Sequence, residues 1–175
     1  MPVILAILGL VVAAGVWAYR IRAAAQVSRD LADMAGDVVS AARRLGFRRR
    51  TNVHPVESVD DPSLAVAATG IAFLELSALP TAEQQAALAA SLAAHTHGSE
   101  TETQERMIVG RWLVSESGGP QQAVTRLARR LYKLDPQGWQ MLLPVLNDVA
   151  RSAGAEMTPR QRDALDEISR VMRIG

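Results

Sequence analysis

His95 and His97 stand two residues apart and are the first candidates for a chemical role, as a pair of metal ligands. They lie in a short His-Thr-His-Gly segment that reads as a turn, and the chain has no cysteine that could complete a zinc site. The lack of cysteine also excludes disulfides and cysteine nucleophiles, and it suits a reducing cytoplasm. Two such histidines in a turn are more often solvated than metal-bound. We therefore predict no metal site.

Motifs for catalysis and cofactor binding are missing from the sequence. It contains no glycine-rich phosphate loop, no Gly-x-Ser-x-Gly and no His-Glu-x-x-His. Glu75 lies on an apolar segment as a helix-end or interface carboxylate, and no catalytic partner accompanies it. The net charge of +1 gives no strong electrostatic case for binding nucleic acid. We predict a protein that is not an enzyme and has no catalytic residue and no cofactor.

Basic side chains gather in two places. The first is a helical face beside Leu127 and Leu131, which is either solvated or binds an acidic protein partner. The second surrounds Gly46 and is either the start of a solvated linker or a contact for anionic lipid. An upright helix would hold the second group about 38 Å from a membrane, several Debye lengths away, so lipid contact requires a helix that lies on the surface. The two groups are Arg126, Arg129, Arg130 and Lys133, and Arg43, Arg44, Arg48, Arg49 and Arg50.

The first 19 residues carry no charged side chain and predict a transmembrane helix. At about 1.5 Å per residue the run spans roughly 25–29 Å, close to the thickness of a hydrocarbon core. A cleaved signal peptide is the alternative, but its positive charge would precede the apolar run, whereas Arg20 and Arg22 follow it. Trp17 and Tyr19 stand where an aromatic belt belongs. The positive-inside rule predicts a single span in a bacterial-type inner membrane, with the N-terminus outside and the remainder in the cytoplasm.

Residues 20–50 are predicted to form a connector with a basic end, in which the helix ends at Gly46, followed by a linker over residues 51–60. Apolar or small residues recur at steps of three and four between Ala24 and Leu45. This stripe would form a short coiled coil with another chain, or pack against the chain's own domain or a partner subunit, and we favour packing. Within the span, Gly9 and Ala13 allow close contact between helices. The predicted interaction residues are Gly9, Ala13, Val27, Leu31, Met34 and Val38.

An all-α domain is predicted over residues 61–175. Alanine and leucine are abundant, and alternating β-branched runs are absent after residue 20. Capping boxes, prolines and glycines mark six helices joined by short loops. With their N-caps, the predicted ranges are 61–77, 81–94, 99–116, 120–134, 135–153 and 158–173.

The first and last helix pairs of this domain resemble each other. Thr81 and Gln84 match Thr158 and Gln161 at a constant offset of 77 residues. The two hairpins are similar to those of the TerB-like family, an all-helical fold of tellurite-resistance proteins and membrane-anchored J-domain co-chaperones. The resemblance covers roughly residues 60–175 and implies the same fold for them.

The acidic motif of that family is altered here. Its turns typically read Ala-Asp-Gly-x-Ile/Leu-Ser/Thr-x-x-Glu, and their carboxylates can hold a metal ion. In this chain Ser77 and Gly154 replace the aspartate, and Gln84 and Gln161 replace the glutamate. A hard cation requires several oxygen ligands with negative charge among them. We therefore expect this chain to share the fold of the family but not its metal site. The chain ends at Gly175 without a J-domain, so a co-chaperone role has little support.

These observations predict a membrane-anchored, non-enzymatic interaction module. Its expected role is that of an accessory or assembly subunit of an inner-membrane protein complex, and its expected partners are the lipid bilayer and either that complex or a second copy of the chain. The alternatives are a TerB-type metal-binding sensor of the stress response, as in tellurite resistance, and an adaptor related to the co-chaperones.

Overall fold

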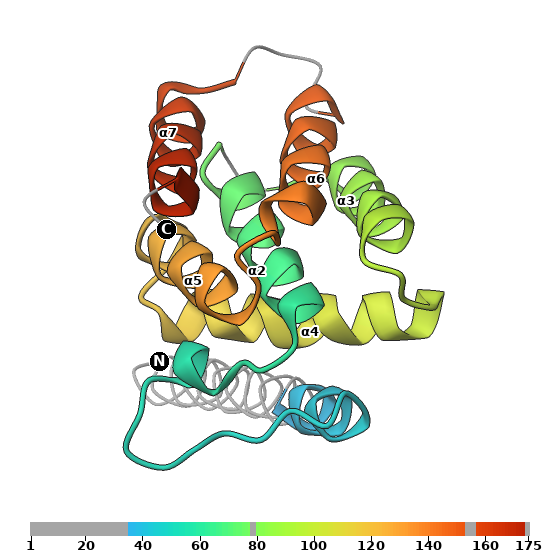
Figure 1. Ribbon diagram of the computed structural model, residues 1–175. Helices are drawn as coiled ribbons and strands as arrows, with labels where there is room; N and C mark the ends of the chain where they lie inside the picture. The colour runs from blue at the N-terminus through green and yellow to red at the C-terminus, as the bar shows by residue number, and fades with distance from the viewer. Residues whose placement is uncertain (1–34, 78–79, 153–156, 174–175) are drawn as a thin grey trace, which may run out of the picture. The chain divides into compact units, whose positions relative to one another are not determined.

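The computed structural model describes residues 35–77, 80–152 and 157–173 (Figure 1). Helices are the only regular secondary structure in these ranges, as the predicted all-α class requires. None of the described helices combines the length and apolar character that crossing a membrane requires. The predicted span, residues 1–19, lies outside the described ranges and stays a prediction. The chain divides into two units, residues 1–39 and 40–175.

Residues 35–44 are helical and carry the end of the predicted connector. Gly46 follows with a φ of +71°, a left-handed conformation that glycine adopts without strain at the end of a helix. Val38 is half-buried, and Ala41 and Leu45 pack on the hydrophobic core of the second unit. The last two residues of the predicted stripe therefore pack against the chain's own domain. The predicted interaction residues that lie outside the described ranges are Gly9, Ala13, Val27, Leu31 and Met34.

Residues 51–60, predicted as a linker, belong to the same compact unit as the helices that follow. They contain a short 3-10 helix, η1 (Pro55–Ser58), whose N-cap His54 accepts a hydrogen bond from the backbone of Val56 at 3.3 Å. Val56 and Val59 are fully buried. This segment is therefore part of the core, which its proline and polar residues did not indicate.

The helix α2 (Pro62–Glu75) forms the centre of the domain, and all its residues from Leu64 to Leu74 are buried. It packs against α4, α5 and α6, while α3 lies against α6 and α7 lies against α5 (Figure 1). A helix that is apolar on every side is stable only when other helices surround it. The surrounding helices are α3 (Ala82–His95), α4 (Glu100–Glu116), α5 (Pro120–Leu134), α6 (Trp139–Ser152) and α7 (Pro159–Arg173).

The crossing of α2 and α4 depends on a glycine. A Cβ atom on Gly110 would lie 2.9 Å from Cδ1 of Ile71 and 3.2–3.3 Å from the backbone of Ala68. Two small residues at the crossing allow the backbones of the two helices to approach closely. This contact holds α4 close against α2, and α5 packs on both of these helices.

The capping residues confirm most of the predicted helix starts. Asp61 caps α2, and Thr81 and Ser99 form the predicted capping boxes of α3 and α4. Thr158 and Gln161 exchange the same pair of hydrogen bonds at α7. Each cap satisfies backbone N–H groups that have no partner within the helix.

The predicted start of α6 at Asp135-Pro136 is wrong. Asp135 accepts a hydrogen bond from the backbone of Gln137 at 2.9 Å, and Gly138 donates to the Asp135 carbonyl at 2.9 Å. A turn therefore occupies residues 136–138, and α6 begins at Trp139. Asp followed by Pro starts a helix or a turn equally well, because in both the carboxylate accepts from the backbone two residues later.

Candidate functional site

A groove with a volume of about 430 Å³ lies between α5 and α7. The two helices pack against each other, and Ala128 and Leu131 on α5 and Ala164 and Ile168 on α7 are buried. Each helix presents three further residues beside this contact, at spacings of three and four that place them on one face. The groove is lined by Arg129, Tyr132, Lys133, Glu167, Arg170 and Val171.

The charges of this α5–α7 groove favour an anionic ligand. Its lining holds three cationic side chains and one carboxylate, which gives a net charge of +2. Within the described residues, none of these four groups takes part in an ion pair. Tyr132 and Val171 add an aromatic ring and an aliphatic surface between the charges. The groove can therefore bind a carboxylate or phosphate group together with some apolar surface.

The basic face predicted from the sequence divides in the structure. Arg129 and Lys133 line the groove, whereas Arg126 is exposed and is not part of the lining. Arg130 turns the other way, and its Nε donates to the carbonyl of Val59 at 2.6 Å. Arg130 therefore has a structural role, because it fixes the end of η1 to α5.

Half of the groove comes from α7 and was not predicted. Glu167, Arg170 and Val171 follow the helical spacing, and they flank the buried Ile168. The spacing alone could have placed them on one face. The sequence contained no signal that this face lies beside Tyr132.

His95 and His97 are not brought together as metal ligands. His95 Nε2 lies 3.6 Å from Oδ2 of Asp148, whereas His97 is exposed with a φ of +50°. Nowhere in the described ranges do three potential metal ligands of the His, Cys, Asp or Glu types gather.

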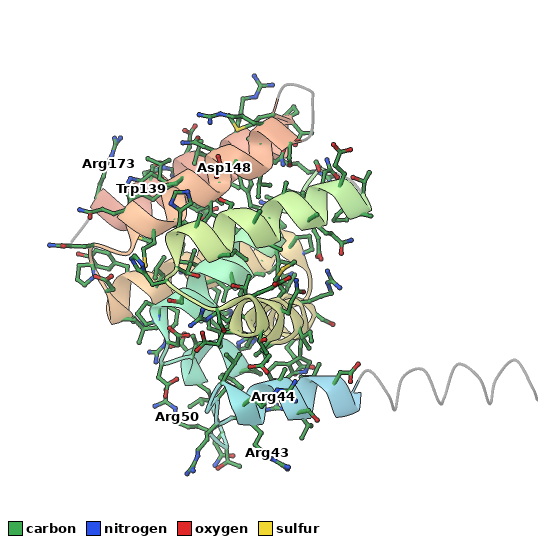
Figure 2. All side chains as sticks on the ribbon, turned by 90° about the vertical axis from the view of Figure 1, so that its right-hand side faces the viewer. Arg43, Arg44, Arg50, Trp139, Asp148 and Arg173 are labelled. Carbon is green, nitrogen blue, oxygen red and sulfur yellow. The ribbon has the colours of Figure 1, made fainter. Side chains whose placement is uncertain are left out.

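Asp148 is the centre of a polar cluster between α3 and α6 (Figure 2). Ser91 Oγ donates to Asp148 Oδ2 at 2.7 Å, the same oxygen that faces His95. A serine nucleophile requires the histidine between the serine and the carboxylate. Here the carboxylate stands between them, so this arrangement links two helices and does not activate Ser91.

The glutamines at the starts of α3 and α7 act as caps. Gln84 accepts a hydrogen bond from the backbone of Thr81 at 3.0 Å, and Gln161 accepts one from Thr158 at 3.1 Å. Gln161 is also buried, and its Nε2 donates to the carbonyl of Phe73 at 3.3 Å. Ser77 Oγ donates to the Leu74 carbonyl at 2.9 Å, and Gly154 lies outside the described ranges.

Glu75 ends α2 and is about half-buried. Burial raises the pKa of its carboxyl group, and the nearby Arg111 guanidinium opposes this only in part. The Nη2 of Arg111 donates to the side chain of Gln85 at 3.1 Å.

No family model, curated protein or solved structure matches this chain. The α5–α7 groove is the feature of the described residues that points most directly to a function.

Proposed function

We propose that this chain is a membrane-tethered, non-enzymatic interaction module that binds an acidic segment of a partner protein in the α5–α7 groove. The observation that carries the proposal is the groove itself, with Arg129, Lys133 and Arg170 around the ring of Tyr132.

The composition of the groove suits a protein segment. Guanidinium groups bind carboxylates through two parallel hydrogen bonds, which gives direction as well as attraction. Tyrosine and arginine are, with tryptophan, enriched at the energetic centres of protein interfaces. A volume of about 430 Å³ is near the lower end for ligand sites. It admits a few side chains of a short segment and not a folded domain.

The tether is part of the proposal. The uncharged residues 1–19 and the arginines that follow them support a single span with the helical domain in the cytoplasm. The partner would then be an integral membrane complex that this chain serves as an accessory or assembly subunit, or a second copy of the chain. The paired caps at Thr81 and Thr158 support a TerB-like domain fold as the binding unit.

Photo-crosslinking in cells tests the groove directly. A benzoylphenylalanine in place of Tyr132 is expected to form one dominant adduct with the partner in the membrane fraction. When the same substitution is combined with Arg129→Glu and Lys133→Glu, we expect most of this adduct to disappear. Reversing two charges repels an acidic partner, and each lost ion pair in a partly desolvated site weakens binding by roughly 10-fold or more.

Controls separate this reading from its alternatives. The crosslinker at Gln140, an exposed position on α6, should give no such adduct. An adduct that survives the double charge reversal, but is lost with Leu31→Asp and Met34→Asp, would place the partner on the connector. Stoichiometric micromolar binding of Ca²⁺, Mg²⁺ or Zn²⁺ in a calorimetric titration of the full chain would favour the metal-sensor alternative.

A further inference from the structure

Arginines gather at one end of the compact unit, in the segment that joins the connector to η1. Residues 43–50 contain five arginines, and no acidic residue occurs between Asp37 and Glu57. Figure 2 shows Arg43, Arg44 and Arg50 at the same end of this unit, with Arg43 pointing away from the helices. We call Arg43, Arg48, Arg49 and Arg50 the arginine pole.

The backbone of the pole is held in place. Phe47 is buried and meets the ring of Trp112 edge-on, with 6.0 Å between the ring centroids. The guanidinium of Arg49 lies 5.9 Å from the centre of the same ring. The backbone N–H of Arg50 donates to Ser58 Oγ at 3.0 Å, and its side chain donates to the carbonyl of Glu57. These contacts hold the backbone of the pole at Phe47 and Arg50, and they position the side chains of Arg49 and Arg50, before any ligand binds.

The charges of the pole are not neutralised within the described part of the chain. Arg44 pairs with Glu105, but no carboxylate there pairs with any of the four arginines of the pole. All four are exposed. Four exposed and uncompensated cations on one surface create a strong local positive potential.

An exposed apolar side chain stands beside these charges. Asn52 has a φ of +66° and turns the chain, and Val53 follows with 42% of its surface exposed. Cationic groups beside an exposed aliphatic side chain are the combination with which peripheral proteins touch a lipid surface.

We infer that the arginine pole and Val53 contact the headgroups of an anionic membrane. The inference rests on the tether of the proposed function, because a span at residues 1–19 keeps the pole close to lipid and raises its effective concentration there. Residues 20–50 hold eight arginines and three aspartates, a net charge of +5, so the whole connector is attracted to an anionic surface. The inference requires that the connector lies along the membrane and does not stand upright.

A single fluorescent label tests the contact. The chain has no cysteine, so Val53→Cys in the full-length protein carries the only thiol. With an environment-sensitive dye on it, the protein is reconstituted into phosphatidylcholine vesicles with or without phosphatidylglycerol. We expect a blue-shifted emission, and quenching by nitroxide lipids, only when phosphatidylglycerol is present. Molar salt should abolish both effects because it screens the arginines.

Two arginines can be neutralised without touching the packing. Arg43 and Arg48 make no side-chain hydrogen bond or ion pair in the described part of the chain, so Arg43→Gln with Arg48→Gln should leave the helical content unchanged. The double variant is expected to weaken the lipid-dependent contact roughly 10-fold or more. The matched control, Arg126→Gln with Arg162→Gln, removes two exposed arginines elsewhere and should retain it. A label at Gln140 should not respond to lipid composition.

The outcomes separate the pole from the tether. The inference is overturned if the emission of the label at residue 53 does not change with phosphatidylglycerol. It is also overturned if the emission changes equally in the double variant. Flotation with pure phosphatidylcholine vesicles measures the span alone. If the protein floats with these vesicles but the label does not respond to phosphatidylglycerol, the tether is supported and the lipid contact of the arginine pole is contradicted. If the protein floats only with anionic vesicles, and the double arginine variant does not float, the lipid contact of the arginine pole is supported and the tether is contradicted.

Discussion

The ion pair between Arg44 and Glu105 joins the end of the connector to α4. The Glu105 side chain is only 6% exposed, whereas that of Arg44 is 57% exposed. Arg44→Met would leave a buried carboxylate without its cation. We expect this variant to lower the free energy of unfolding by about 1–3 kcal/mol, measured by urea denaturation of the full chain in mild detergent.

The adjacent Arg43 provides the control, since the described residues show no partner for it. Arg43→Met should change stability by less than about 0.5 kcal/mol. Adding Glu105→Gln to Arg44→Met should recover part of the loss, because the remaining amide is neutral. Equal effects of the two arginine variants would contradict the assigned role of the pair.

Glu75 makes stability depend on pH. Burial raises its pKa in the folded state above the unfolded value of 4.5, so the folded state binds the proton more tightly. The resulting advantage is fully present below pH 4.5 and is lost as pH rises through the folded pKa. Glu75→Gln should therefore be more stable than the parent at pH 7.5 and indistinguishable from it near pH 4. Denaturant titrations at both pH values measure this, and a less stable variant at pH 7.5 would show that the Arg111 attraction dominates.

At this scale the sequence identified residue types better than residue roles. Arg129 and Arg130 are neighbours on the same helix, but one lines the groove and the other binds the carbonyl of Val59. Successive residues on a helix point about 100° apart. The partner that distinguishes them lies 71 residues earlier, where no local pattern reveals it.

Among the helices, the α2–α4 crossing gives the sharpest prediction. Gly110→Ala should improve helix propensity by roughly 0.5–1 kcal/mol but push against the backbone of Ala68, which cannot rotate away. We expect a net destabilisation of about 1–3 kcal/mol and a lower melting temperature.

Gly36→Ala is the matched substitution, since its added Cβ meets nothing within 4 Å. It should leave the melting temperature unchanged or raise it slightly. If both variants behave alike, the crossing is looser than the structure indicates.

Helix boundaries were the most predictable elements. Asp61, Thr81, Ser99 and Thr158 satisfy free N–H groups with their own side chains, so the signal is local and the sequence shows it directly. The burial of η1 was missed because it depends on contacts with α4 and α5, which are distant in the sequence.

For the whole molecule, the membrane span remains the central prediction. A green fluorescent protein fused after Gly175 should fluoresce, and alkaline phosphatase fused there should be inactive, because the arginines after Tyr19 favour the cytoplasmic side. After cell fractionation, fluorescence of the full-length fusion should be found in the membrane fraction. After removal of residues 1–19 it should be found in the soluble fraction. Active alkaline phosphatase would reverse the assigned orientation.

The packing of α5 against α7 could not be derived from their amphipathic patterns. Each of these two helices shows one apolar face, but the five helices around α2 could be arranged in several ways. The groove exists only because these two helices are neighbours, so the site could be predicted in part on α5 and not at all on α7.

The burial of α2 has a consequence for how the protein is made. Glu75 is the only charged residue among its 14, and α4, α5 and α6 together cover it. On the ribosome, α2 emerges well before α5 and α6, so two of the helices that cover it are not yet available. A nascent chain therefore exposes a helix with a single charged residue until most of the domain has been synthesised, and such a segment is a natural substrate for chaperones that bind near the exit tunnel.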